Sequence, residues 1–554
     1  MLPVKKEIVK HLNEIADMME FNNENIFKVK AFRNGANSIR GYDGDIMVLI
    51  AEERLSDIKG IGKGIQPVIL DFVASGNSKL HAELISGLPK GITELFSIKG
   101  IGPKKAAQLY HELQITDRSS LALAAENNLI AGLQGFGTKT EEKISEELQK
   151  ITENEKFCLI DKGFRLLSEL ETKISGIKGV SKISYTGEAR RINEIFSALE
   201  FVILAESAEY VQKESARFIT ESTLAESVIE GYYMALQVRI YVTSSGDQFY
   251  STLFKTTGSP EFLSAISYAG QSSDSEEKIF KDLGFPYIAP ENRESEFIES
   301  QWIKDYKLPE LNLTDFKGHF HFHTSYSDGF NSVAEMVETA KQAGYDYSVV
   351  CDHSQSAFYA GGLTPAKIEK QLEEIERVRD SGSRVFQGIE SDILADGSLD
   401  YPEEILKNFT LVVASIHSRL NLTEEEMTAR IIKAIENPYT DILAHPSGRI
   451  LLKRDPYPVN LFKVIDACAA NDVALEINAN PKRLDTDWRY LFYAREKGVK
   501  FAINADAHSA DQIAFVNFGI MTARKAGITA GEVINCYSFD QFRQFASRKV
   551  SRRL

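Results

Sequence analysis

The sequence predicts a multidomain fold with an α-helical N-terminal region, an α+β middle region and a C-terminal barrel of alternating strands and helices. Three observations lead to this prediction. Gly-x-Gly turns recur three times between helix-like segments before residue 150, a helical segment and three strand-like runs follow between 151 and 255, and seven short apolar runs alternate with helical segments from 318 onwards. A chain of 554 residues has room for several domains, and 43% hydrophobic with 26% charged residues is typical of a globular protein.

Composition also excludes several classes of protein. No apolar run is long enough to cross a bilayer and no secretory signal opens the chain, so we expect a cytoplasmic protein without a membrane partner. The four cysteines show no CxxC spacing, which argues against a disulfide framework and a zinc ribbon and favours buried thiols. A net charge of -15 does not itself indicate nucleic-acid binding, so local patches must decide.

The three N-terminal turns share one pattern: an apolar helix end, Gly-x-Gly, a lysine, and another helix. Their glycines and lysines are Gly60, Gly62 and Lys63; Gly100, Gly102 and Lys104; and Gly135, Gly137 and Lys139. Two glycines permit a tight turn that presents backbone N–H groups at a helix N-terminus, where a phosphate binds with help from the lysine. These turns resemble helix-hairpin-helix motifs, which bind DNA backbones without reading sequence. Three helix turns with glycine caps remain the alternative.

The middle region reads as one helix followed by strands. The helix is expected at 157–173 and the strands at 182–187, 199–204 and 236–242.

The C-terminal runs end in chemically active residues. Six of the seven end in His, Asp or Glu, and chemistry in βα barrels is located at the carboxyl ends of the strands. Helices are expected between them, for example at 365–379 and 424–436. In the first run, 318–324, His and Phe alternate, so a strand there would place His319, His321 and His323 on one face. The pattern predicts a metal site.

These residues resemble the nine-ligand signature of the PHP (polymerase and histidinol phosphatase) domain. The matching residues are His321, His323, Asp328, His353, Glu390, His417, His445, Asp506 and His508. His319 departs from the family, which usually has Asp there. The resemblance implies three divalent metal ions, of Mn, Zn or Fe.

The resemblance also divides the ligands among the three metals. His321, His323 and Asp506 would hold one ion, and Glu390 would bridge it to a second ion held by His417 and His445. Asp328, His353 and His508 would hold the third. Glu390, His321, His323 and Asp506 are the expected catalytic residues. Basic residues near the strand ends are candidates to position a phosphate: Arg419, Arg449, Lys453, Arg454 and Arg483.

The order of the remaining motifs resembles bacterial X-family DNA polymerases that carry a PHP domain. Residues 186–191 resemble the Gly-Ser-x-Arg-Arg motif of the palm, with Glu188 in place of Ser, followed by Arg190 and Arg191. The family's Asp-x-Asp falls on Ala198 and Glu200, and its third Asp falls near Arg239. Two-metal phosphoryl transfer needs several carboxylates, so we expect an inactive palm, with Mg²⁺ bound only if the palm is active.

The resemblance also bears on a second reaction of the family. Lyase-proficient relatives carry a Schiff-base lysine where this chain has Val68, and Pro67 interrupts the helix pattern, so lyase activity is not expected.

The expected domains are a helical DNA-binding domain (1–88), fingers with helix-hairpin-helix (89–150), a degenerate palm (151–255), a thumb (256–312) and a PHP phosphoesterase barrel of the (β/α)7 type (313–554). The leading hypothesis is a monomeric DNA repair protein that acts on gapped, nicked or 3′-end-containing DNA as a metal-dependent 3′-5′ exonuclease. The alternatives are a bifunctional DNA polymerase and 3′-5′ exonuclease and a non-catalytic DNA-end-binding factor. Histidinol phosphatase fits less well, because it gives no reason for three hairpin motifs.

Overall fold

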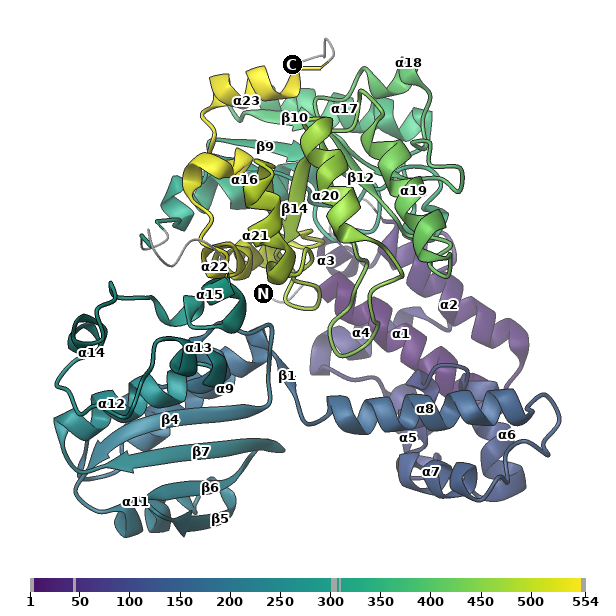
Figure 1. Ribbon diagram of the computed structural model, residues 1–554. Coiled ribbons are helices and arrows are strands. Elements are labelled where there is room, and N and C mark those ends of the chain that lie inside the picture. The colour runs from purple at the N-terminus through teal and green to yellow at the C-terminus, as the bar shows by residue number, and fades with distance from the viewer. Residues whose placement is uncertain (1–3, 43–45, 300–305, 308–309, 550–554) are drawn as a thin grey trace. The chain divides into compact units, whose positions relative to one another are not determined.

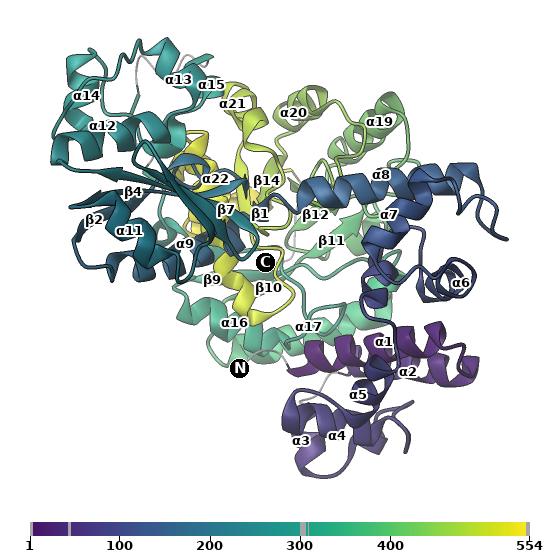
Figure 2. The ribbon, with the colours of Figure 1, turned by 90° about the horizontal axis from the view of Figure 1, so that it is seen from below.

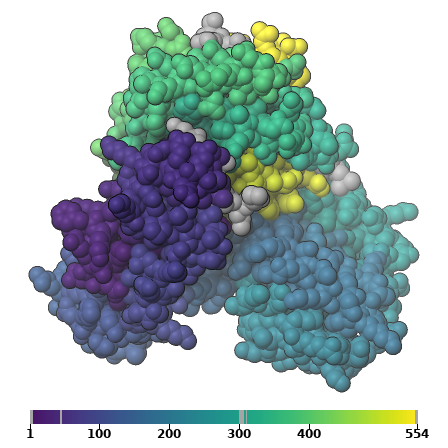
Figure 3. Space-filling model, turned by 180° about the vertical axis from the view of Figure 1, so that it is seen from behind, coloured from purple at the N-terminus to yellow at the C-terminus, as the bar shows by residue number. Residues whose placement is uncertain are grey.

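The computed structural model describes residues 4–42, 46–299, 306–307 and 310–549. It divides into two compact units, Met1–Asn154 with Thr324–Ser332, and Glu155–His323 with Val333–Leu554. In Figures 1 and 3 the colour runs from purple in the N-terminal helices of the first unit to green and yellow in the C-terminal domain of the second unit.

The first unit is helical, as the sequence predicts. Its helices are α1 (Val4–Phe21), α2 (Ile26–Arg40), α3 (Ile46–Ala51), α4 (Gln66–Ser75), α5 (Lys79–Ser86), α6 (Pro103–Leu113), α7 (Arg118–Glu126) and α8 (Thr138–Asn154). They bury two apolar cores, one around α1, α2 and α4 and the other around α6, α7 and α8. The expectation that Pro67 interrupts a helix is wrong. Pro67 lies in the first turn of α4, where a helix needs no N–H donor from it.

The second unit begins with a mixed sheet. Its strands, in the order β2-β4-β7-β6-β5, are β2 (Val180–Tyr185), β4 (Ala198–Ala205), β7 (Leu236–Thr243), β6 (Val228–Tyr233) and β5 (Thr220–Ala225). Helix α9 (Ile160–Ser175) packs its apolar face on this sheet, and β1 (Cys158–Leu159) pairs with β3 (Ile195–Phe196). The helices that follow are α10 (Gly187–Arg190), α11 (Ala208–Ser215), α12 (Gly246–Thr257), α13 (Pro260–Ala265), α14 (Glu276–Asp282) and α15 (Ser295–Glu299). The predicted helix and three strands are confirmed.

The C-terminal domain contains all seven predicted strand runs, each paired in parallel with its neighbours. They are β8 (Gly318–His319), β9 (Tyr347–Val350), β10 (Val385–Gln387) with β11 (Ile389–Asp392), β12 (Val412–Ser415), β13 (Ile442–Leu443), β14 (Ala474–Asn478) and β15 (Phe501–Asn504). The third run is split into β10 and β11 at Gly388. A Cβ at this position would lie 2.8 Å from Cys351 Sγ and from the Leu411 carbonyl oxygen, so the packing leaves no room for a larger residue.

The strands form two sheets that are connected at both edges. The sheets are β10-β9-β8 and β11-β12-β13-β14-β15, and isolated parallel bridges join Phe322 to Ala507 and His353 to Glu390. Helices lie outside the strands (Figure 2): α16 (Val333–Gln342), α17 (Pro365–Asp380), α18 (Glu403–Leu406), α19 (Glu424–Ile435), α20 (Leu461–Ala470), α21 (Trp488–Glu496), α22 (Val516–Lys525) and α23 (Phe539–Ala546). Both strand faces are therefore covered, which explains why the runs are continuously apolar.

The first run differs from the prediction in one respect. Strand β8 ends at His319, and His321 has a φ of +47°, so 318–324 is not one continuous strand and its period of two is broken. His319 does not share the face of His321 and His323. Its ring instead stacks on Phe322 with the centroids 4.6 Å apart, and both of its nitrogens lack hydrogen-bond partners among the described residues.

Two composition-based expectations can be compared with the structure. Within the described residues, no helix combines the length and apolar character that a bilayer span requires. All four cysteines are free, and Cys158, Cys351 and Cys468 are buried, as expected.

Candidate metal centre

The predicted ligands lie together at the carboxyl ends of the strands. His321 and His323 follow β8, His353 follows β9, Glu390 lies in β11, and His417 and His445 follow β12 and β13. Asp506 and His508 follow β15. Parallel strands bring these positions to the same end of the domain, although up to 187 residues of sequence separate them.

Glu390 is the residue that faces most of the imidazoles. Its Oε2 lies 2.6 Å from His353 Nδ1, and its Oε1 lies 3.0 Å from His445 Nε2 and 3.4 Å from both His321 Nε2 and His417 Nε2. A single buried carboxylate thus contacts ligands from four other strand ends. This arrangement would let the carboxylate bind a metal ion together with imidazoles from several strands.

Among the described residues of the second unit, three groups of predicted ligands, which are mostly buried, lie close enough to hold a metal ion. In each of them the ligand atoms lie within 4.8 Å of one another: His321, His323 and Asp506; His321, Glu390 and His445; and His353, Glu390 and His417. The first group is the predicted first metal position. The predicted second position does not form a single group. His445 lies near Glu390 together with His321, whereas His417 lies near Glu390 together with His353.

The donor set fits divalent transition metals. Imidazole nitrogens with carboxylate oxygens suit Mn²⁺, Zn²⁺ and Fe²⁺. His321 Nε2 is fully buried yet has no hydrogen-bond partner among the described residues, although it lies 3.4 Å from Glu390 Oε1 and 3.7 Å from Asp506 Oδ1. A buried polar atom of this kind is costly unless a ligand satisfies it, so the residues fit a bound cation.

The charges of the site depend strongly on one another. Burial raises the pKa of Glu390, but the imidazoles of His353, His417 and His321 outweigh it and hold the pKa well below its usual value. For His321 burial lowers the pKa, and Glu476, Glu390 and Asp506 together raise it well above the ordinary value. Burial lowers the pKa of His323 to about 3.

Three of the ligands have an unusual backbone. His321, His445 and Asp506 have φ values of +47°, +27° and +49°, in a region that side chains other than glycine rarely occupy. Such conformations persist where the surrounding structure holds them, and they cluster at functional sites. The backbone thus turns each of these side chains toward the same centre.

Several residues that contact the predicted ligands from behind were not singled out from the sequence. Glu476 Oε1 lies 2.5 Å from His321 Nδ1, and Asp392 Oδ1 lies 2.6 Å from His417 Nδ1. Asn478 donates to Asp506 Oδ2 at 3.1 Å. These partners fix the tautomer and orientation of the ligands. Their position in the strands could have identified them. Glu476 and Asn478 are two residues apart in β14, and Asp392 comes two residues after Glu390 in β11, so the members of each pair point to the same face of their strand.

Asp328 is a ligand whose prediction stays open. It lies in the segment Thr324–Ser332, which belongs to the first compact unit, so its place at the third metal remains a prediction. His508, the second predicted ligand of that metal, stacks on His323 with the centroids 4.2 Å apart.

The basic residues near the strand ends fall into different classes. Arg449 is buried and its guanidinium donates to Asp487 Oδ2 at 2.6 Å and to main-chain carbonyls, so it supports the fold. Arg483 Nε lies 3.7 Å from Asp506 Oδ2, beside a predicted ligand. Arg454 is exposed and donates to the Gly448 carbonyl, and Arg419 and Lys453 are also exposed.

The predicted palm site has its charged groups paired. Glu200 on β4 lies opposite Arg239 on β7, with Arg239 Nη1 3.4 Å from Glu200 Oε1, and Tyr241 donates to the same oxygen at 3.2 Å. Glu188 accepts from the Ser197 backbone N–H and hydroxyl at 2.6 and 2.7 Å. Ala198 is buried.

The palm arginines are likewise paired. Arg190 binds Glu276 at 2.6 Å, and Arg191 binds Glu294 at 2.9 Å.

The three Gly-x-Gly turns have the predicted geometry. Gly60, Gly100 and Gly135 have φ values of +96°, +91° and +81°, and each turn precedes a helix, α4, α6 or α8. A Cβ added at the second glycine, Gly62, Gly102 or Gly137, would meet no atom within 4 Å, so packing does not require glycine there. The lysines Lys63, Lys104 and Lys139 are exposed. The open space leaves the backbone N–H groups accessible to a phosphate.

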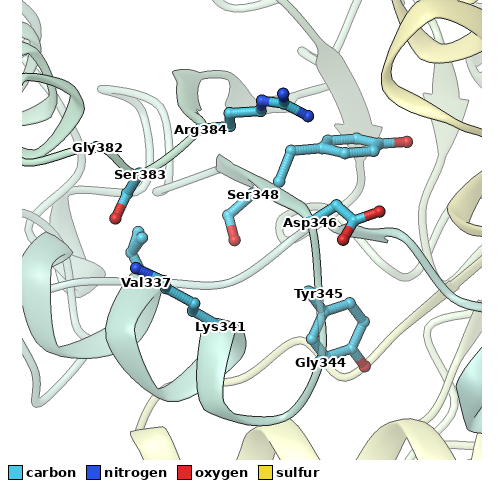
Figure 4. Close-up of a pocket in the computed structure, with 10 residues that line it drawn as sticks. Val337, Lys341, Gly344, Tyr345, Asp346, Ser348, Gly382, Ser383 and Arg384 are labelled. Atoms are coloured by element: carbon cyan, nitrogen blue, oxygen red, sulfur yellow. The ribbon is translucent and has the colours of Figure 1, made fainter.

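A cavity of about 420 Å³ lies at the opposite ends of the strands (Figure 4). Lys341, Asp346, Ser348 and Arg384 line it, near the amino ends of β9 and β10. It is therefore separate from the metal ligands.

Comparison with known proteins matches the chain to three families. It matches the helix-hairpin-helix domain over residues 3–78, the SAM-like helix-hairpin-helix tandem over 92–150 and the PHP domain over 319–480. The chain is 32% identical over 574 residues to the DNA polymerase/3′-5′ exonuclease PolX of Bacillus subtilis (strain 168), with 98% of this chain and 99% of that protein covered. It is 30% identical over 234 residues to Probable phosphatase Teth514_1060 of Thermoanaerobacter sp. (strain X514), with 39% of this chain and 88% of that protein covered.

Proposed function

Since this chain belongs to the bacterial PolX family of DNA polymerase/3′-5′ exonucleases, with helix-hairpin-helix domains and a C-terminal PHP domain, we propose that its PHP domain is a metal-dependent 3′-5′ exonuclease acting on DNA. The family predicted from the sequence motifs is confirmed by this similarity.

The observation that carries the proposal is the position of Glu390 among four imidazoles at the strand ends. Structural barrels have no reason to bury a carboxylate and several histidines at one point, since buried charge is costly unless it is paired or bound to a metal. The relatives named probable phosphatases match a part of the chain, 39% of it in the case of the Thermoanaerobacter protein, and their name supports phosphoester hydrolysis as the chemistry of this centre.

Each set of residues has a role in this reaction. Divalent metal ions bound to such ligands lower the pKa of water and neutralise charge that develops on a phosphate oxygen. Glu390, His321, His323 and Asp506 would hold them, and Glu476 and Asp392 keep the imidazoles of His321 and His417 in the orientation that binding needs.

Two further groups act on the DNA itself. Arg483, next to Asp506, is placed to attract a DNA phosphate to the centre. The Gly-x-Gly turns of the first unit would bind the DNA backbone elsewhere along the duplex.

The experiment is a gel assay of the full chain on 3′-unpaired and gapped DNA that is labelled at its 5′ end, with Mn²⁺ and without nucleotides. Stepwise shortening from the 3′ end, abolished by a chelator and restored by Mn²⁺, is the expected result. Retardation without any shortening would instead favour the non-catalytic DNA-end-binding factor.

A second candidate function is template-directed DNA synthesis. The full-length similarity to a relative named DNA polymerase/3′-5′ exonuclease favours the bifunctional alternative over our expectation of an inactive palm. Glu200 would then have to exchange Arg239 for Mg²⁺, or other carboxylates would have to take over. Adding the four nucleotides to the same gel assay separates the two candidates, because extension and shortening move the band in opposite directions.

A further inference from the structure

Two exposed aromatic side chains stand beside the metal centre. Phe358 and Tyr359 form a short turn after β9, Phe358–Ala360, and their side chains are 85% and 57% exposed. Large aromatic residues usually bury most of their surface, and an exposed pair next to a functional centre suggests a binding role.

Tyr359 lies close to a predicted metal ligand. Its ring centroid is 6.5 Å from that of His417, and Phe358 follows at 6.3 Å from Tyr359. His417 Nε2 is in turn 3.4 Å from Glu390 Oε1. A planar group stacked on Tyr359 would therefore lie close to His417 and the other predicted metal ligands.

The turn that carries the two rings is firmly held. Gly361 has a φ of +72°, and a Cβ at Gly362 would lie 1.9 Å from the Ser354 carbonyl oxygen, so the chain can turn back here only with glycine. The Lys367 ammonium donates to the Gly361 carbonyl at 2.6 Å.

The same turn is linked to the metal ligands through a shared carboxylate. Ser356 donates its hydroxyl to Asp392 Oδ2 at 2.8 Å, while Asp392 Oδ1 holds His417 Nδ1 at 2.6 Å. The exposed rings are thus fixed relative to His417, which reduces the entropy lost when a ligand stacks on them.

Positive charge lies on the same rim. Arg454 is near enough to interact electrostatically with both Tyr359 and Arg483, and Arg483 is the residue beside Asp506. Exposed aromatic rings combined with arginines are the means by which proteins bind single-stranded nucleic acid, with bases on the rings and phosphates on the cations.

We propose that Phe358 and Tyr359 form a stacking subsite for the unpaired terminal nucleobases of the DNA strand that enters the metal centre. The proposal rests on the exonuclease function above and specifies its substrate as a frayed or single-stranded end. Stacking holds the end of the strand apart from its complement, and the phosphodiester attached to the stacked nucleotide then reaches the ligands around Glu390. Stacking uses the π-face that every base has, so the subsite accepts any sequence.

The test compares the full chain with its Phe358→Ala/Tyr359→Ala variant on two single-stranded oligonucleotides, one ordinary and one whose last two 3′ nucleotides lack bases. We expect kcat/KM on the ordinary strand to fall at least about thirtyfold, which corresponds to about 1 kcal/mol for each of two stacked bases. On the strand without terminal bases, variant and wild type should be equal. Tyr359→Trp, which keeps a large ring, should retain the wild-type rate on the ordinary strand.

Controls separate this proposal from the exonuclease function itself. Phe462→Ala removes another exposed aromatic ring, which lies on α20 against Tyr490 and Tyr493, and it should change neither rate. An equal loss of rate on both oligonucleotides, or no loss on either, overturns the stacking subsite. A wild-type protein that does not shorten either oligonucleotide overturns the exonuclease function instead.

Discussion

Replacing Glu390 with Gln tests whether the buried cluster is a catalytic metal centre. Glutamine has nearly the same shape as glutamate, so packing around β11 is kept while the negative charge is removed. The Oε atoms of Glu390 lie 2.6–3.4 Å from nitrogens of His353, His445, His417 and His321. No other side chain of the predicted site connects so many ligands, among the residues that the structure describes.

The size of the effect follows from the charge that the substitution removes. A carboxylate about 4 Å from a unit charge contributes about 4 kcal/mol where the effective dielectric constant is about 20, and 1.36 kcal/mol corresponds to a factor of ten. Losing it beside even one metal ion should therefore lower cleavage about a thousandfold, and beside two ions further still. Glu476→Gln alters the support of His321 and the acceptor of the His445 backbone N–H but removes no predicted metal ligand, so it should lower activity about tenfold to a hundredfold.

The assay measures three quantities on the same samples. Cleavage is followed on gels, metal content by elemental mass spectrometry, and DNA affinity by fluorescence anisotropy. We expect Glu390→Gln to lose cleavage and metal but to keep its DNA affinity, because the charge acts on the metals and on the transition state. Glu373→Gln, on the exposed face of α17, is the matched control and should behave as wild type. Cleavage by purified Glu390→Gln at more than a tenth of the wild-type rate would refute the reasoning.

Three further predictions concern other parts of the chain. Replacing the three hairpin lysines Lys63, Lys104 and Lys139 with Gln should weaken DNA binding and lower the slope of log affinity against log salt by up to about one for each lysine, and an unchanged slope in a titration from low to high salt would show that they do not contact phosphates. If the chain extends primers, the pair of Glu200 with Arg239 decides which carboxylates take part: extension that Glu200→Ala abolishes would show that this carboxylate binds the catalytic metal, and unchanged extension would show that other carboxylates do. Burial opposes ionisation of Glu276, but Arg293 and Arg190 lower its pKa to about 2. The stability that this carboxylate contributes should therefore be complete above pH 4.5 and should disappear as the pH falls toward 2. Urea unfolding of wild type and Glu276→Gln across that range measures the difference in stability, and a difference that grows as the pH falls would contradict the prediction.

Much of the fold was accessible from the sequence because its signals are local. Parallel strands covered on both faces must be continuously apolar, so seven runs such as 411–417 could be identified one at a time. Residues that end such runs meet in space by topology alone, which brought Glu390 and His445 together in the prediction. The hairpin turns were predicted for a similar reason, since positive φ at Gly60 is a property of glycine itself.

The remaining features depend on contacts that no local pattern reveals. Alternation in 318–324 predicted that His319 would join His321, but the backbone leaves the strand conformation at His321, with φ +47°, and His319 packs on Phe322 instead. Glu476 supports His321 across 155 residues of sequence, and nothing distinguishes it locally from other acids at strand ends. The prediction for Pro67 was wrong for a different reason. A proline in the first turn begins a helix whereas a proline in the interior interrupts it, and the sequence pattern did not show which of these positions Pro67 occupies.

The residues that resemble the palm motif, 186–191, also contact the C-terminal domain, which belongs to the same compact unit. Arg191 binds Glu294, and the buried ammonium of Lys525, from α22 of the C-terminal domain, lies 3.0 Å from the same carboxylate. Lys525 also donates to the Arg191 carbonyl at 2.7 Å, while Arg190 is held by Glu276. Breaking a buried ion pair by removing one partner costs about 3–5 kcal/mol, so a nucleotide triphosphate at this motif would have to compete with carboxylates that already neutralise both arginines. The residues that resemble a nucleotide-binding motif therefore connect the mixed sheet to the C-terminal domain in this structure, and any DNA synthesis at this motif must proceed with that connection in place or at the cost of breaking it.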